Sequence, residues 1–373
     1  MSQDAGLFSQ VVMHFLAPVR QFLTDEGVSE VMINGPDDIY IERRGILEKT
    51  DCRFDTPDAL MAAVRNIGQF VGRRVDQNTA HFDARLPDGS RVHVVIPPCA
   101  RTGPYIAIRR FSRQLLGLDD LVSRGSMTVQ AAQFLKACVR AYKSLVVSGG
   151  TGSGKTTLLN MLSAFADQGE RVITIEEACE LQLRNPHVVA LECRAPDKHG
   201  QGEVTIRDLL ACSLRLRPDR IIVGEVRRGE ALDMIQAMNT GHSGSMTTVH
   251  ANSCRDALHR LETLTLMAGL EMPLIAARAQ VASAVNLVVQ AARFHDGARR
   301  ITQVSEVLGL DSKGDYDTRD LFLFHLEGVN RETGATCGNL RPTGTMPSFW
   351  QELKIMQPDL DDAIFRPAGD QRA

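Results

Sequence analysis

Residues 146–157 read Val146-Val-Ser-Gly149-Gly-Thr-Gly-Ser-Gly-Lys155-Thr-Thr157. This stretch contains the Walker A pattern, Gly-x-x-x-x-Gly-Lys-Ser/Thr, between an apolar run and a helix-forming run over 158–166. Glycines let successive backbone N–H groups turn toward phosphate oxygens, and the N-terminus of the following helix adds partial positive charge. The stretch therefore predicts a strand, a phosphate-binding loop and a helix that together hold a nucleoside triphosphate.

Each residue of this loop has a predicted role. Lys155 would reach the outer phosphates, and the Thr156 hydroxyl would complete the ligand shell of Mg²⁺. ATP and Mg²⁺ are therefore the expected cofactors. The predicted nucleotide-binding residues of the loop are Gly149, Gly150, Thr151, Gly152, Ser153, Gly154, Lys155, Thr156 and Thr157.

Composition indicates an ordinary globular protein of two or three domains. The chain has 373 residues, of which 43% are hydrophobic and 23% charged, with a net charge of −3. This acidic balance argues against stable nucleic-acid binding. No run approaches the roughly 20 apolar residues of a membrane span, and the N-terminus does not resemble a signal peptide. The eight cysteines contain no Cys-x-x-Cys pair, so we expect free thiols in a reducing cytoplasm rather than disulfides or a zinc site.

The first part of the chain predicts a small α+β domain. Helical patterns over about 7–25 and 57–72 are mixed with strand patterns near 31–42, 86–96 and 105–111. We place an N-terminal helical segment at 1–27, the α+β domain at 28–113 and a polar linker at 114–127.

From residue 128 onward, helix and strand patterns alternate, which predicts a mainly parallel sheet wrapped by helices. We assign this α/β domain and its C-terminal extension to 128–373. After about 286 the strand patterns become shorter, and a last helix is predicted near 347–356. Earlier elements are predicted at 128–142 (helix), 144–148 (strand), 171–176 (strand), 204–215 (helix), 220–225 (strand), 229–239 (helix) and 246–249 (strand).

Two apolar strand patterns end in carboxylates, as the active site of a nucleoside triphosphatase requires. Glu225 follows Ile221–Val223 and would hold Mg²⁺ through water. Glu176 and Glu177 end the strand pattern one element earlier, and because adjacent strand residues point to opposite faces, only one of the two can face the nucleotide. We assign the water-polarising base to Glu176, with Glu180 as a weaker candidate. A solvated or structural role is the alternative for each carboxylate.

Histidines and arginines complete the candidate site. His242 and His250 flank a short strand pattern, and a histidine ring can donate to a γ-phosphate or couple its loss to a moving loop. A structural role is the alternative for each histidine. Guanidinium groups suit phosphates, and one from another domain or subunit can stabilise the transition state, whereas a surface salt bridge is the alternative for each. The candidate arginines are Arg91, Arg101, Arg109, Arg110, Arg215, Arg217, Arg220, Arg227 and Arg228.

With these motifs the chain resembles the type II/IV secretion ATPase superfamily, and within it the CpaF/TadA family of Flp (Tad) pilus motors. The Walker A stretch, Ile173–Glu177, Leu216–Arg227 and Gln236–Asn252 correspond to the family's Walker A, Asp box, Walker B and His box. In the first half, the matching stretches are 30–36, 71–76, 83–92 and 108–111.

The resemblance implies a homohexameric ring. Each subunit would carry a PAS-like N-terminal domain and a RecA-like ATPase domain, with the nucleotide between them. It implies that Glu176, Glu225, Lys155, His242 and His250 are catalytic, that Thr156 and Glu225 hold the metal, and that Arg109 or Arg110 contacts phosphate. It also implies a location at the cytoplasmic face of the inner membrane, on a TadB/TadC-like platform protein, where the motor drives pilus assembly or retraction.

Three departures and three alternatives accompany this resemblance. The family's Asp box usually reads Glu-Asp, whereas Glu177 stands at its second position, and the N-terminal extension is reduced to about 27 residues. The tetracysteine zinc module of type II secretion ATPases is absent. An ATPase of a type IV secretion or conjugation system shares every box and is the alternative function. An assembly factor that switches on ATP without useful turnover is a second alternative, and a nucleic-acid motor is a third, disfavoured by the acidic balance and by only 5% aromatic residues.

Overall fold

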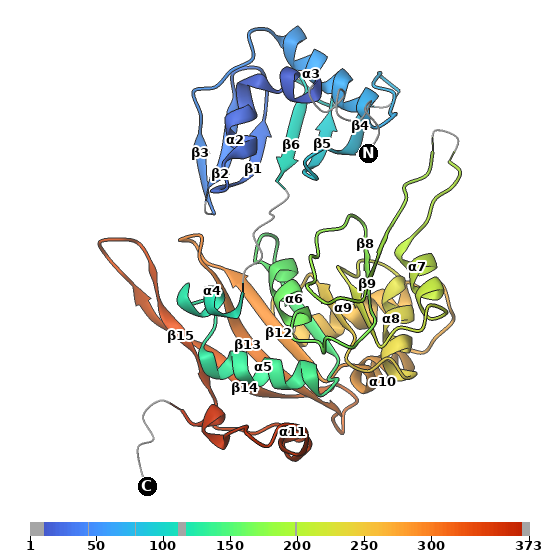
Figure 1. Cartoon of the computed structure of the whole chain (residues 1–373), viewed down its shortest axis with the longest axis vertical. Coiled ribbons are helices and arrows are strands. Elements are labelled where there is room, and N and C mark those ends of the chain that lie inside the picture. Colours follow the sequence, from blue (N-terminus) through green and yellow to red (C-terminus); the bar gives the residue numbers. More distant parts are fainter. Residues whose placement is uncertain (1–10, 44, 79, 111–116, 198–199, 368–373) are drawn as a thin grey trace. The chain divides into compact units, whose positions relative to one another are not determined.

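The computed structural model describes residues 11–43, 45–78, 80–110, 117–197 and 200–367 (Figure 1). The chain divides into two compact units, Met1–Gln114 and Leu115–Ala373, each of which is described by itself. All eight cysteines are free thiols, as the sequence predicted.

The first unit is built on a 6-stranded antiparallel sheet in the order β3-β2-β1-β6-β5-β4. Apolar side chains alternate along its strands and pack beneath α3, which begins after Thr56, whose hydroxyl accepts a hydrogen bond from the Ala59 amide. The elements are η1 (Ala17–Val19), α2 (Arg20–Thr24), β1 (Val28–Ile33), β2 (Ile39–Arg43), β3 (Ile46–Lys49), α3 (Pro57–Phe70), β4 (His81–Arg85), β5 (Arg91–Val95) and β6 (Tyr105–Arg109).

The N-terminal segment belongs to this core. Val12, Leu16, Val19 and Leu23 are buried together with the sheet and α3. The helix predicted over 7–25 is interrupted, since η1 contains Pro18, which lacks the N–H that a continuous α-helix needs. Residues 7–10 of that prediction lie outside the described residues.

The second unit contains a 9-stranded sheet in the order β15-β14-β13-β12-β7-β11-β10-β8-β9. The strands from β12 to β9 are parallel, and β12 to β15 form antiparallel pairs. The mainly parallel sheet predicted from the sequence is therefore confirmed. The strands are β7 (Leu145–Gly149), β8 (Val172–Glu176), β9 (Val188–Glu192), β10 (Arg220–Val223), β11 (Met246–Val249), β12 (Leu287–Arg293), β13 (Arg299–Leu310), β14 (Tyr316–Val329) and β15 (Thr336–Pro342).

Helices cover both faces of this sheet. Leu145 and Val147 face the core formed with α5 and α6, whereas Val146 faces the core formed with α7 to α10. This alternation along β7 is the period of 2 expected for a strand buried on both sides. The helices are α4 (Leu118–Ser123), α5 (Val129–Arg140), α6 (Lys155–Ser163), α7 (Ile206–Ser213), α8 (Glu230–Asn239), α9 (Cys254–Leu266), α10 (Leu274–Ala284), α11 (Trp350–Met356) and η2 (Asp362–Phe365).

The structure differs from the sequence prediction in three places. The segment predicted as a linker, 114–127, contains α4, and Leu121 and Met127 pack into the core of the second unit; residues 114–116 lie outside the described residues. Helices α9 and α10 and strand β9 were not predicted. The strands after 286 are longer than expected, since β13 has 12 residues and β14 has 14, and their polar solvent-facing residues weakened the apolar pattern.

Candidate functional site

The candidate site lies at the carboxyl ends of the parallel strands of the large sheet. Ser148 pairs with Val249, and Val223 pairs with both Thr247 and Ile175, so β7, β11, β10 and β8 finish side by side. Loops at the carboxyl ends of such strands are the usual ligand sites of open α/β sheets.

The loop between β7 and α6 has the backbone shape of a phosphate-binding loop. Gly152 and Gly154 adopt φ values of 71° and 91°, in the left-handed region that favours glycine. A Cβ on Gly149 would lie 2.4 Å from the Ala291 carbonyl oxygen, so only glycine fits there. Ser153 donates a hydrogen bond to the Gly150 carbonyl at 2.9 Å and closes the loop.

A chain of charged side chains leads away from this loop. Lys155 Nζ donates to the Gly150 carbonyl at 3.0 Å and lies 3.4 Å from both ring nitrogens of His250. His250 Nε2 lies 2.7 Å from Glu225 Oε1. Arg227 then joins Glu225 to Glu177, with contacts of 2.7 and 2.6 Å. The tertiary structure thus brings together residues from four separate sequence motifs.

Glu177, rather than Glu176, faces this charged chain. The buried Glu176 carboxylate accepts hydrogen bonds from the backbone amides of Glu180, at 3.0 Å, and Leu181, at 3.2 Å. These bonds hold the segment that follows β8. The Glu176 side chain thus binds the backbone after β8 while Glu177 reaches Arg227, and the role of Glu176 as the water-polarising base stays a prediction.

His242 lies before the amino-terminal end of β11, whereas the phosphate-binding loop lies at the carboxyl ends of the strands. His242 precedes β11, whereas His250 follows it, and the 4 residues of β11 span about 13 Å. Its backbone amide donates to Ala237 at the end of α8. Of the two predicted histidines, His250 is the one in contact with Lys155, and the catalytic role of His242 stays a prediction.

The two arginines predicted from the first unit differ in their environment. Arg110 donates to the carbonyl oxygens of Leu23 and Val28, each at 2.9 Å, and also to that of Asp25. It holds the turn between α2 and β1, which favours the structural alternative for Arg110 over the predicted phosphate contact. Arg109 ends β6 with an exposed side chain, and its phosphate contact stays a prediction.

Known proteins place these features in a family. A family model described as "Type II/IV secretion system protein" matches residues 14–311. The chain belongs to this family. It is 35% identical to the conjugal transfer protein TrbB of Rhizobium radiobacter, over 77% of this chain and 86% of TrbB. It is 32% identical to the type IV secretion system protein PtlH of Bordetella pertussis, over 80% of this chain and 95% of PtlH.

A solved member of this fold is the ATPase DotB of Legionella pneumophila. Its X-ray structure matches with a TM-score of 0.56 and 20% identity, covering 81% of this chain and 82% of DotB. The likeness confirms the predicted fold class, a RecA-like α/β domain preceded by a small α+β domain. The superfamily predicted from the sequence is confirmed as well. Among the described residues of this type II/IV secretion family member, no helix is long and apolar enough to cross a membrane.

The donor groups of the site suit a magnesium nucleotide. Thr156 follows Lys155 at the first turn of α6 and supplies a hydroxyl, and Glu225 supplies a carboxylate 2.7 Å from His250. Such hard oxygen ligands, completed by phosphates and water, are those that Mg²⁺ prefers. When bound, the ion would neutralise negative charge on the phosphates.

Gln290 is a site residue that sequence reasoning missed. This buried side chain on β12 accepts a hydrogen bond from the Ser148 hydroxyl, just before the loop, and donates to the Ala251 carbonyl, just after His250, at 3.2 Å. It therefore ties the phosphate-binding loop to the segment that carries His250. A polar residue inside the apolar run 287–292 was the available signal.

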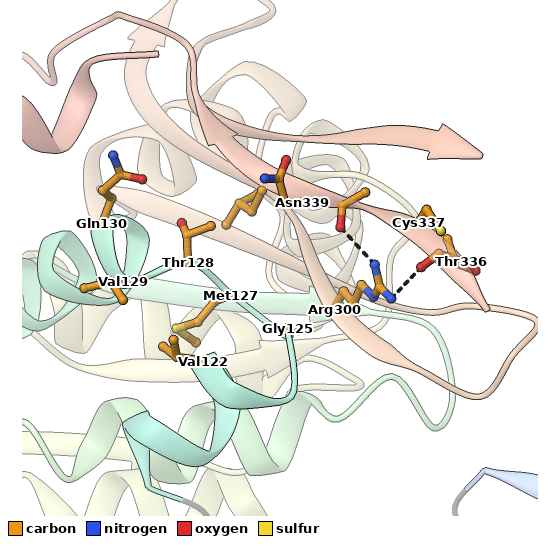
Figure 2. Close-up of a pocket in the computed structure, with 12 residues that line it drawn as sticks. Val122, Gly125, Met127, Thr128, Val129, Gln130, Arg300, Thr336, Cys337 and Asn339 are labelled. Atoms are coloured by element: carbon orange, nitrogen blue, oxygen red, sulfur yellow. Dashed lines mark hydrogen bonds between the residues drawn. The ribbon is translucent and has the colours of Figure 1, made fainter. Parts of the chain in front are cut away.

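A separate cavity of about 570 Å³ lies between the α4–α5 segment and strands β13 and β15. Arg300 lines it and donates to the carbonyl oxygens of Gly338, at 3.1 Å, and Thr336, at 2.7 Å (Figure 2). None of the residues predicted for nucleotide binding lines this cavity. It is therefore distinct from the candidate nucleotide site.

The protonation of His250 predicts a pH dependence. Burial is the largest influence and lowers its pKa below the usual 6.5; Glu225 opposes this, and Lys155 and Arg227 lower it further. Neutral His250 therefore persists at pH 7 and charges only below pH 6.5, where it would add a positive charge beside Lys155. We expect kcat/KM for ATP to be flat from pH 8 to 6.5 and to fall below that.

The matched variant is His250→Asn, which keeps a polar side chain but does not titrate in this range. Its kcat/KM should be lower, and the part of the acidic decline due to His250 should disappear. A wild-type decline centred above pH 6.5 that His250→Asn removes would contradict the lowered pKa.

Proposed function

We propose that this protein is an ATPase that powers a type IV secretion or conjugation machine. The observation that carries the proposal is the convergence of Lys155, His250 and Glu225 at the phosphate-binding loop. Such a site can hold a triphosphate and place a carboxylate beside its terminal phosphate. The names of the relatives TrbB and PtlH, conjugal transfer and type IV secretion proteins, support the choice of machine.

In this proposal the chain's residues divide the work. The loop amides and Lys155 bind the phosphates, and Thr156 and Glu225 hold Mg²⁺. Glu177, through Arg227, and His250 set the position and charge of Glu225. Water then attacks the γ-phosphate, and ADP and phosphate leave. The side chains around Glu225 thus respond to the presence or loss of the γ-phosphate. A motor requires such a response, because it must change its conformation when ATP is hydrolysed.

In this proposal six copies form a homohexameric ring. The ring lies at the cytoplasmic face of an inner membrane and docks on a platform protein. The resemblance of the four sequence boxes to those of secretion ATPases supports this assembly. Mass measurement of the purified protein with ATP and Mg²⁺ should give a hexamer. A monomer at micromolar concentration under those conditions would count against the ring.

A second candidate function is the assembly motor of an Flp (Tad) pilus, acting through a TadB/TadC-like platform. The specific observation in its favour is the resemblance of the first unit, through 30–36 and 83–92, to the CpaF/TadA family. The two functions share the same ATPase chemistry and differ in cargo.

One experiment tests the ATPase and separates the two cargoes. Purified protein should release phosphate from ATP in steady state, and an absence of turnover would favour an assembly factor that only switches on ATP. In the source organism, deletion of the gene should abolish conjugal transfer or substrate export and leave pilin on the cell surface unchanged. Loss of surface pilin with normal transfer and export would overturn the secretion assignment in favour of the pilus motor.

A further inference from the structure

Two arginines from a distant hairpin lie against the phosphate-binding loop. Arg293 ends β12 and Arg299 begins β13, and the two are paired in register. A Cβ built on Gly152 would lie 3.1 Å from Arg293 Nη1, and one built on Gly154 would lie 3.4 Å from Arg299 Cδ. Both left-handed glycines of the loop are therefore covered by an arginine side chain.

The hairpin that carries these arginines is held in one shape. The Phe294 amide donates to the Ala298 carbonyl at 2.8 Å across the turn. The Asp296 carboxylate accepts from the amides of Ala298, at 2.9 Å, and Thr336, at 2.6 Å. The turn is thus fixed to β15, and the two arginines project from a rigid support, as a preorganised binding site requires.

The two arginines stand directly opposite each other, one on β12 and one on β13. Arg293 is half-buried and Arg299 is exposed, so neither side chain is closed off from solvent. Planar guanidinium groups match phosphate oxygens in geometry and charge.

The order of the strands indicates which phosphate they reach. Strand β7 lies between β11 and β12. Lys155 contacts His250 at the end of β11, so the charged side chains that lead to Glu225 lie on the β11 side of the loop. Arg293 and Arg299 occupy the β12 side. A bound nucleotide with its γ-phosphate toward Glu225 and His250 would turn the other end of its phosphates toward the arginines.

We propose that Arg293 and Arg299 bind the α-phosphate of the nucleotide and set affinity for ADP and ATP alike. This inference rests on the proposed nucleotide site and assigns it a second set of ligands. The two sides of the loop then have different roles. The β11 side acts on the γ-phosphate, whereas the β12 side retains the nucleotide whether or not the γ-phosphate is present.

The test measures dissociation constants for ATP, ADP and inorganic pyrophosphate by competition with a fluorescent ADP analogue. We expect Arg293→Ala and Arg299→Ala each to weaken ATP and ADP by about 10–100-fold, the loss typical of one charge-assisted contact. Pyrophosphate would occupy the β and γ positions and leave the α position empty. Its dissociation constant should therefore be the same in both variants as in the wild type. Arg293→Lys should recover part of the affinity.

Controls separate this inference from the proposed function. Arg341→Ala removes an arginine of edge strand β15 that binds Asn339 and Glu327, and it should leave all three affinities unchanged. Lys155→Ala should weaken all three, and normal binding in that variant would overturn the nucleotide site itself. If Arg293→Ala and Arg299→Ala bind ADP as Arg341→Ala does, or weaken pyrophosphate as much as ADP, the α-phosphate assignment is overturned. Melting curves confirm that each variant folds.

Discussion

Lys155→Ala is expected to lower kcat/KM for ATP by about 10²–10³-fold, the usual cost of removing one group that stabilises developing charge. Lys155 Nζ donates to the Gly150 carbonyl and lies beside His250. It is therefore already held within the loop, and the phosphates would replace a contact rather than order a free side chain. Steady-state phosphate release and nucleotide titration measure the effect.

The fold should survive this change. Gly150 is exposed, so its carbonyl can bond to water once the lysine is gone. The matched control is Lys143→Ala, which removes a lysine just before β7, at its other end, where it pairs with Glu352 at 2.6 Å. That variant should hydrolyse ATP normally. Equal turnover in Lys155→Ala and Lys143→Ala would refute the role of the loop.

Glu225→Gln is expected to reduce kcat by about 10²–10⁴-fold, the range for loss of an acid–base or charge-stabilising group. The substitution keeps the size of the side chain but removes the charge that joins His250 to Arg227. Since the loop is untouched, ATP should still bind, so the loss should appear in kcat and not in affinity. A single-turnover assay with bound ATP measures it directly.

The neighbouring glutamates serve as comparisons. Glu177→Gln removes only an exposed contact to Arg227, so its kcat should fall by less than about tenfold. Glu176→Gln removes a buried acceptor of backbone amides and should lower the melting temperature. If instead Glu176→Gln melts like the wild type and loses as much kcat as Glu225→Gln, Glu176 is the base after all.

The sequence predicted the fold well where the signal is local. The loop pattern around Lys155 and the alternation of helices and strands after residue 128 each depend on neighbours in the chain, and both were read correctly. Helices α9 and α10 were missed between the His box and β12, where the sequence has no Walker-type motif to anchor the assignment. Pro18 lies inside the first predicted helix and accounts for its interruption.

The candidate site required contacts that no local pattern contains. Glu176 and Glu177 are adjacent and chemically identical, so the sequence does not show in which direction each side chain points. The Glu176 carboxylate points to the amides of Glu180 and Leu181, which donate hydrogen bonds to it. Arg110 looked like a phosphate ligand but is used by the turn between α2 and β1. In both cases a backbone hydrogen-bonding requirement, which depends on the folded path of the chain, assigned the side chain.

The sequence by itself determined that this chain holds a phosphate-binding loop on a parallel sheet, because glycines, a lysine and a hydroxyl at fixed spacing dictate that loop's geometry. Only the tertiary structure decided which partners surround it. His250 reaches the loop and His242 does not because one follows and the other precedes a buried strand. Arg293 and Arg299 reach it because β12 lies next to β7 in the sheet although it comes much later in the chain, and strand order is set by the packing of the whole core.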